Sequence, residues 1–498
     1  MIFYKKNLNR HHQKQKEYTF SVFEDGLAVE KDDSVAQPTQ CHNAYNISFE
    51  DGSLSTGLGV RFLQVPADVS HLNNLHTFDM NDIGAVLNVL VDKWYNSETA
   101  QYYYQIFIVD FNKKIRALPA IDPYNGRTWI QSERLTEAPS HCCVYREEDV
   151  DSTLFFANSG VVALSYGQEH VYANVPEMLS CVVHYGTFFG ITKADRNKLI
   201  YTNKLKLSTW TENEGLSVIE FLDNRGAFTK LVTFNDYVYL FRENGITKIS
   251  KYSLNGDFAF THLYYSPSKI YENSICVCGD KIFFVTRDGI YTFDGNKVAK
   301  VLRNYDKYFK HLKNDYCSSC CLNGKYYLAT NCDFQDGQVV GWEDRFYYNN
   351  VLFEIDVFNK DVKVLRGVDI KQLAVIDSPY YSKVICSFNS TCTNQLGEII
   401  NDGKIINVAT PKSWTSFCTD FGYYNKRKKI KEIVLKSKYD CQIKIISDEE
   451  SKTFSISGRE NMQRMQVNVC GKEFKVEFLS SNSDIKICKP KFVFDVVV

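Results

Sequence analysis

Short runs of alternating apolar and polar residues recur along this 498-residue chain, with the period of two that a β-strand requires. Residues 237–241, which read YVYLF, are one example of a more continuously apolar run. Between the runs lie six Asp-Gly and four Asn-Gly dipeptides, which together contain ten of the 26 glycines. Both residues of such a dipeptide tolerate positive φ, as two-residue hairpin turns demand. The pattern predicts an all-β chain built from hairpins.

A repeat emerges when the hairpins are superimposed. In residues 151–160, 236–245 and 280–289 an Asp precedes a Gly by nine positions, an apolar strand lies between them, and a second strand follows the Gly. The last two copies begin 44 residues apart. We expect further strand starts at spacings of roughly 34–58 residues, so that the full series falls near residues 103, 152, 186, 236, 280, 325 and 383. A period of about 40–50 residues is typical of β-propellers, and we predict a β-propeller of about six to eight blades.

The ends of the chain differ from this repeat. Residues 1–40 are polar and predict a flexible or partner-bound N-terminal arm, and residues 41–69 a β-hairpin through which the chain enters the fold. We assign residues 70–425 to the propeller. Residues 426–498 alternate without the blade pattern and predict a small C-terminal β-sandwich domain. Residues 303–312 form the best helix candidate.

Composition narrows the classes of function. Lys and Arg number 58 and Asp and Glu 59, so a protein that coats nucleic acid through its overall charge is excluded. Aromatic residues make up 14% of the chain, and we expect their rings to fill the space between blades. No apolar run reaches the ~18 residues of a membrane span, and the start of the chain has no apolar signal region. These features predict no membrane partner, and mostly free, buried thiols in a reducing cytoplasm.

Catalytic and cofactor motifs are missing from the sequence. It contains no G-x-x-x-x-G-K-[ST], G-x-S-x-G or G-x-G-x-x-G motif, so we predict no enzyme activity and no cofactor. Cys317, Cys320 and Cys321 raise the possibility of zinc, but the second CxxC pair of a typical site is missing. We therefore interpret these cysteines as core thiols, with zinc as the alternative.

One basic stretch is the strongest candidate for a contact site. Its members are Lys426, Arg427, Lys428, Lys429, Lys431, Lys436 and Lys438. One interpretation is a solvated strand edge whose charges resist pairing with another strand. The alternative is a contact with DNA phosphates or with an acidic partner.

Three parts of the sequence resemble one family. Residues 44–60 are similar to a strand–turn–strand opening motif, residues 197–210 and 226–246 to two successive blades, and residues 467–478 to a closing pair of sandwich strands. Together they resemble the β-propeller head-to-tail connector or nozzle proteins of tailed bacteriophages. Leu58 and Asn203 stand where that family more often has a basic residue and Asp.

The resemblance implies a non-enzymatic virion structural protein. Such a protein is assembled in the host cytoplasm and forms a homo-oligomeric ring in the tail or neck, where it contacts portal, adaptor and other tail proteins. The ring extends the DNA exit channel and touches DNA transiently. Two alternatives stay open: a carbohydrate-engaging propeller, either glycosidase or lectin, whose rim aromatics stack on host-surface sugars, and an intracellular scaffold propeller unconnected with a virus.

Overall fold

The chain forms two compact units, residues 60–400 and residues 1–59 with 401–498. The computed structural model describes residues 15–20, 23, 40–49, 52–63, 86–96, 101–110, 115–117, 139–147, 150–165, 168–202, 205–207, 210, 216–250, 258–334, 336, 339–341, 349–377, 382–389 and 396–497. Almost all of these residues lie in strands or in the turns between them. Each unit is considered by itself below.

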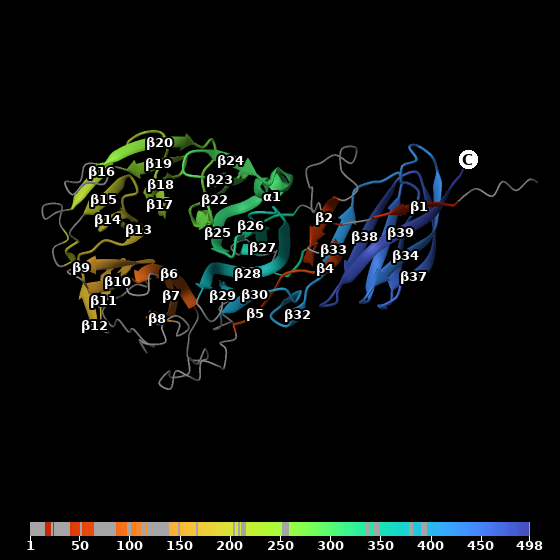
Figure 1. The fold of residues 1–498 in the computed structure, drawn as a ribbon, viewed down its shortest axis with the longest axis horizontal. Helices are drawn as coiled ribbons and strands as arrows, with labels where there is room; N and C mark the ends of the chain where they lie inside the picture. Colours follow the sequence, from red (N-terminus) through yellow and green to blue (C-terminus); the bar gives the residue numbers. More distant parts are fainter. Residues whose placement is uncertain are drawn as a thin grey trace, which may run out of the picture. The chain divides into compact units, whose positions relative to one another are not determined.

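Residues 60–400 form a ring of antiparallel sheets, with strands such as β16, β20 and β24 on its outer side (Figure 1). In chain order the first four sheets are β6 (Val86–Asn96), β7 (Gln101–Asp110) and β8 (Ile115–Ala117); β9 (His141–Glu147), β10 (Val150–Ala157), β11 (Gly160–Ser165) and β12 (Gln168–Tyr172); β13 (Met178–His184), β14 (Thr187–Thr192), β15 (Lys198–Thr202) and β16 (Ser217–Glu220); and β17 (Phe228–Phe234), β18 (Tyr237–Arg242), β19 (Gly245–Ser250) and β20 (Ala259–Tyr265). These are four successive blades of a β-propeller.

The remaining blades differ in how they begin and end. The fifth blade comprises β21 (Cys276–Cys278), β22 (Lys281–Thr286), β23 (Gly289–Phe293) and β24 (Val298–Val301). A larger sheet follows with β25 (Leu312–Leu322), β26 (Lys325–Cys332), β27 (Asn349–Asp356), β28 (Val362–Asp377), β29 (Ser382–Phe388), β30 (Gly397–Ile400) and β5 (Gly59–Phe62). The 16-residue strand β28 serves two blades, because its first part pairs with β27 and its second part with β29. The described residues therefore make seven blades.

Two features explain how the last blades are built. Gly367, with φ +86°, lies at the register shift in the pairing of β28 with β27, just before Ile370, where β28 meets both β27 and β29. Strand β5, from the other end of this unit's sequence, then lies beside β30 and completes the seventh blade. The buried carboxylate of Glu398 in β30 pairs with Arg61 in β5 and with Lys383 in β29. An ion pair thus joins the first and last strands of the ring.

The hydrophobic core of this unit lies between neighbouring blades. Leu90 and Phe107 of the first blade pack with Phe155 of the second, and the Phe107 and Phe155 rings are edge to face at 4.8 Å. Similar clusters join the second blade to the third, the third to the fourth, the fourth to the fifth, and the seventh to the first. Phe283 of the fifth blade stacks on Tyr326 of the sixth at 5.0 Å. Aromatic side chains therefore fill the space between blades, as their abundance predicted.

The predicted repeat corresponds to one strand of each blade. The seven predicted starts fall within two residues of the second strands β7, β10, β14, β18, β22, β26 and β29. Tight turns precede several of them; Asn323 and Gly324, before β26, have φ +51° and +73° as a two-residue hairpin turn requires. The helix candidate at residues 303–312 contains the short helices η6 (Arg303–Tyr305) and α1 (Asp306–Lys310). A further turn of helix is η5 (Glu272–Ser274).

The second unit is a β-sandwich. One sheet has the order β3 (Ile47–Ser48), β4 (Leu54–Thr56), β39 (Lys486–Val496), β34 (Lys428–Ser437) and β37 (Gln463–Gly471), with β1 (Lys16–Thr19) also paired to β39. The other has the order β2 (Cys41–Tyr45), β33 (Lys412–Ser416), β38 (Phe474–Ser480), β35 (Cys441–Ser447) and β36 (Ser451–Ile456). A small hairpin, β31 (Lys404–Ile405) with β32 (Val408–Ala409), also belongs to this region of the chain. Trp414, 1% exposed, lies in its core against Phe20, Phe23 and Phe478.

The sandwich draws on both ends of the sequence, which corrects the predicted boundaries. It includes residues 401–425 and most of residues 41–59, so residue 425 does not separate it from the propeller and the hairpin is not an independent element. The N-terminal arm is not wholly free, because Lys16–Thr19 pairs with β39 and Phe20 is buried. The cause is apolar burial: Phe20 and Phe23 cover Trp414.

No helix in the part of the chain that the structure describes is long and apolar enough to cross a membrane.

Candidate functional site

The innermost strands of the propeller are the first candidate site, because a channel at the axis of a ring is bounded by them. Each first strand has one edge that no strand of its own blade covers, and such edges leave N–H and C=O groups unpaired. In this propeller a polar side chain bridges every step from one blade to the next. We call these side chains the hub belt; they are Asn88, His141, Ser180, Lys230, Ser319, Ser318 and Gln372.

In four of these bridges, a side chain of one blade donates to or accepts from a backbone group that belongs to the blade following it in the sequence. Asn88 Nδ2 donates to Pro139 O at 2.8 Å, and His141 Nε2 accepts from Cys181 N at 3.2 Å. Ser180 Oγ accepts from Leu231 N at 3.0 Å. The fourth joins the fourth and fifth blades, where Lys230 Nζ donates to Ile275 O at 2.7 Å.

Three further bridges complete the circle. Ser319 Oγ donates to Asn273 O at 2.9 Å. Its neighbour Ser318 accepts from Leu373 N at 2.8 Å. The final bridge joins the seventh blade to the first, where Gln372 Oε1 accepts from Val89 N at 2.8 Å.

Sequence reasoning missed the hub belt. Its members are single polar residues of five different types, with no common motif. The one available signal is a polar residue within the first strand of every blade but the fifth, and that signal needs the blade boundaries first. Each bridge is a hydrogen bond between a side chain and a backbone group at the inner edge of a neighbouring blade. We therefore interpret the bridges as contacts that stabilise the closed ring.

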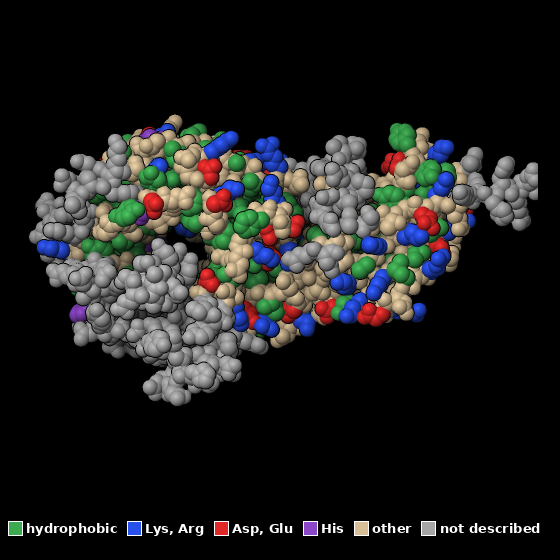
Figure 2. Space-filling view, in the orientation of Figure 1, with side chains coloured by type: hydrophobic (Ala, Val, Ile, Leu, Met, Phe, Trp, Pro, Cys, Tyr) green, Lys and Arg blue, Asp and Glu red, His purple; other side chains and the backbone are tan. Residues whose placement is uncertain are grey.

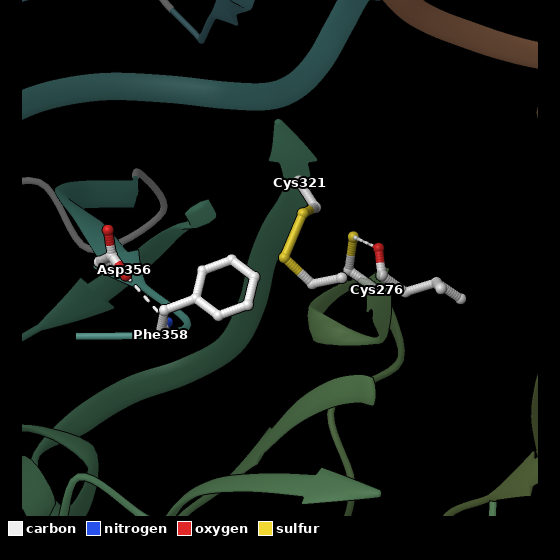
Figure 3. Close-up of a disulfide and its surroundings, with 6 residues drawn as sticks. Cys276, Cys321, Asp356 and Phe358 are labelled. Atoms are coloured by element: carbon white, nitrogen blue, oxygen red, sulfur yellow. Dashed lines mark hydrogen bonds between the residues drawn. A yellow bond between two sulfur atoms is a disulfide. The ribbon is translucent and has the colours of Figure 1, made fainter. Parts of the chain in front are cut away.

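A disulfide lies beside this belt. Cys278 in β21 is bonded to Cys321 in β25, with 5.5 Å between the Cα atoms, and so joins the fifth blade to the sixth (Figure 3). Cys276 lies next to it on the same strand, with a thiol that is not in a disulfide. Among the described residues 13 cysteines are free and nine of these are buried, as expected, but the interpretation of Cys321 as a core thiol is wrong, because it is bonded to Cys278.

The possible zinc ligands are not assembled for that role. Cys321 is committed to the disulfide, and among the described residues no group of three or more His, Cys, Asp or Glu side chains is placed to hold a metal ion. Burial raises the pKa of Cys276 to about 11 and of Cys317 to about 12. These thiols therefore stay protonated near neutral pH and are poor nucleophiles and metal ligands.

Buried charged groups elsewhere in the propeller have structural partners. Arg242, 1% exposed, lies 2.6 Å from a carboxylate oxygen of Asp223, and Arg366, fully buried, lies 2.6 Å from Asp336. Burial lowers the pKa of Lys230, whose ammonium group serves the hub belt. These contacts bind blades and loops together.

The predicted basic stretch does not form one positive surface. Lys428 is buried, its Nζ donates to Tyr423 O at 2.9 Å, and burial lowers its pKa. Arg427 binds both carboxylate oxygens of Glu449, at 2.7 and 2.6 Å. Basic and acidic side chains are interspersed on the described surface in view (Figure 2).

The rest of the stretch separates into two groups. Lys426 is exposed and Lys429 half-buried, and Lys431 pairs with Asp495 at 2.5 Å. Lys436 and Lys438 lie together near the end of β34 and share Glu460. The contact that the sequence predicted for all seven residues is therefore reduced to smaller groups, and its role stays a prediction.

Comparisons with known proteins concern the fold. No family model matches the chain, and no curated protein matches it. Among solved structures it is similar to BBS1N in a complex with ARL6DN, at 8% identity and a TM-score of 0.40, over 64% of this chain and 93% of that one. BamB from Moraxella catarrhalis aligns at 13% identity and 0.35, over 62% and 81%. Hsv2p from Kluyveromyces lactis aligns at 10% and 0.30, over 53% and 81%. The chain's own sheets define it as a β-propeller with a β-sandwich.

Proposed function

We propose that this protein is a non-enzymatic structural component of a bacteriophage virion, which forms a homo-oligomeric ring in the tail or neck. One observation carries the proposal: a hydrogen-bonded side chain bridges every one of the seven blade-to-blade steps at the hub. These seven side chains help to hold the ring of blades closed. A protein that serves as a building block needs that rigidity.

The placement of the family-like sequence stretches supports the same role. Residues 44–60 include the antiparallel pair β3 and β4, and residues 226–246 include the hairpin of β17 and β18. Residues 467–478 include the ends of β37 and β38, which lie in the two sheets of the sandwich. The first two stretches form strand–turn–strand elements of the kind that the resemblance implies; the strands of the third belong to the sandwich but pair with other strands rather than with each other.

Charge is consistent with a channel wall that lets DNA pass. A wall that bound phosphates strongly would slow passage, and the affinity of a protein for DNA grows with the number of phosphates it neutralises. The net charge of −1 and the engagement of Arg427, Lys428 and Lys431 leave few basic groups of the predicted stretch for such contacts. The partners in this proposal are other copies of the chain, portal or adaptor proteins and other tail proteins.

Electron microscopy tests the proposal. The full chain, purified at tens of micromolar and imaged in negative stain, should form rings of several copies, and mass spectrometry of purified virions should contain its peptides. A stable monomer that is absent from virions would contradict the proposal. Specific binding or cleavage on an array of host-surface glycans, without ring formation, would favour the carbohydrate-engaging alternative.

A further inference from the structure

The end of the strand pair β34 and β39 brings three lysines together. Lys436 lies opposite Cys488 in the antiparallel register, and Lys438 N donates to Lys486 O at 3.0 Å, so Lys438 and Lys486 are also opposite. Positions two apart on a strand share a face. Lys436, Lys438, Lys486 and Cys488 therefore project from one face, while Ser437 between them is buried.

These side chains surround a hollow of about 230 Å³, which is lined by Lys436, Lys438, Lys486, Cys488 and Glu460. Three of these five lining residues are lysines, and one is a glutamate. Glu460 lies in the loop between β36 and β37, and its oxygens are 4.0 Å from Lys436 Nζ and 3.8 Å from Lys438 Nζ. Since one liquid water occupies about 30 Å³, the hollow has room for a tetrahedral oxyanion and several waters.

Two other basic residues in or beside β34 have close acidic partners. Lys431 meets Asp495 at 2.5 Å, and just before the strand Arg427 grips Glu449 with two hydrogen bonds. At the hollow two lysines share one distant carboxylate that is 71% exposed. Like charges directly opposite each other on neighbouring strands repel. An anion between the ammonium groups would relieve that repulsion and accept a hydrogen bond from each.

We propose that this hollow is a binding site for a phosphate group. A phosphate has a charge of about −1.5 to −2 and acceptor oxygens, which suit a hollow lined by three lysines. The same chemistry is presented by inorganic phosphate and by the backbone of DNA. The site is built by residues of one chain, so it does not depend on formation of a ring.

Titration calorimetry on the full chain with inorganic phosphate tests the site. Binding with a Kd of about 1 mM or tighter is expected at low salt. The double variant Lys438→Gln, Lys486→Gln should weaken it at least tenfold, because two of the three ammonium groups are lost. Glu460→Gln should tighten it several-fold by removing the competing carboxylate. Lys444→Gln, which changes a lysine of β35 paired with Glu477, is the matched control and should leave it unchanged.

The source of the phosphate is distinguished with a second ligand. If a short DNA duplex also binds, and the double variant weakens DNA binding as much as phosphate binding, the site takes a backbone phosphate. If only the binding of inorganic phosphate depends on the lysines, the site takes the free anion. Equal phosphate binding by the wild type and the double variant overturns the proposal, as does an equal loss in Lys444→Gln. The absence of phosphate binding to the wild type overturns it as well.

Discussion

The propeller and the sandwich are built from the same kind of strand, but the chain connects them in opposite ways. Residues 60–400 make the propeller as one segment, in which each sheet consists almost entirely of consecutive strands. The sandwich pairs strands from both ends of the sequence, as when Ala44 lies opposite Trp414 and Lys16 opposite Phe494. The propeller is thus a continuous segment between the two parts of the chain that form the sandwich; it needs one distant pairing, of β5 with β30, whereas the sandwich needs several.

This difference has consequences for stability. Local pairing is cheap in entropy, because the loops that it closes are short, whereas each sandwich pairing across the two ends closes a loop of hundreds of residues. The propeller spreads its stabilisation over many interfaces between blades. The sandwich has a buried core of its own, in which Trp414 packs against Phe20, Phe23 and Phe478. A substitution or chemical change within one unit should therefore alter mainly the stability of that unit.

The largest effect is expected from Trp414→Ala. Loss of a buried aromatic side chain should lower the free energy of unfolding of the sandwich by about 3–5 kcal/mol. Scanning calorimetry of the full chain should show that transition moving while the propeller transition stays in place. Phe188→Ala, in the fully buried core between the second and third blades, is the counterpart and should shift the propeller transition instead. A common shift of one transition by both variants would show that the two units unfold together.

Reduction of the Cys278–Cys321 disulfide should affect the propeller alone. The bond closes a loop with a sequence separation of 43, for which the chain-entropy estimate is about 4 kcal/mol. Denaturant unfolding with and without a reducing agent measures the difference. The variant Cys278→Ala, Cys321→Ala should match the reduced protein and lose its response to the reducing agent. An equal effect of the reducing agent on both forms would contradict this prediction.

Raising the pH should lower the stability of the propeller through Cys317 and raise the stability of the sandwich through Lys412. The folded pKa of Cys317 is raised to about 12 from 9.0, so between these values the unfolded thiol ionises first and the propeller loses stability, by about 2–3 kcal/mol at pH 11. Burial lowers the folded pKa of Lys412 to about 8 from 10.5, so the unfolded chain holds the extra proton and the sandwich gains stability as pH rises across that window.

Single variants isolate these two groups. Cys317→Ala should flatten the loss of propeller stability above pH 9, and Lys412→Met should remove the gain in the sandwich, each measured as the difference from wild type in denaturant unfolding at several pH values. Lys412 Nζ donates to Asn482 O, Thr410 O and Gly403 O at 2.7, 3.0 and 3.2 Å, so Lys412→Met also has a cost that does not depend on pH. An unchanged pH slope in either variant would refute the assignment of that group.

The smallest effect is expected at the hub belt. Ser180→Ala leaves the buried N–H of Leu231 without the hydroxyl that accepts from it, which should cost about 1–2 kcal/mol of propeller stability. Ser217→Ala, on the outer strand β16, is the control and should change stability by less than about 0.5 kcal/mol. Hydrogen exchange at Leu231 should accelerate in the first variant only. Unchanged protection there would show that the bridge does not hold the inner edge.

The contrast between local pairing in the propeller and distant pairing in the sandwich also decides how much of the fold the sequence predicts. The second strand of every blade could be located, because its apolar run and its turn residues lie within about ten positions of each other. The sandwich was only half found, since nothing near Cys41–Tyr45 indicates that Lys412–Ser416 is its partner. The sequence showed the basic stretch as a run of lysines and an arginine. It did not show the ion pairs of these residues with Glu449, Asp495 and Glu460, which come from other strands and loops.

Local alternation, turn chemistry and the spacing between repeats determined by themselves that this protein is an all-β chain with a propeller and a sandwich, because strand and hairpin preferences act over a few residues. The tertiary structure alone decided that the described strands of the ring make seven blades, that both chain ends build the sandwich, and that Lys486 joins Lys436 and Lys438 around one hollow. Those outcomes depend on which distant strands pair, and pairing is selected by burial and closure of the whole fold rather than by any short stretch of residues.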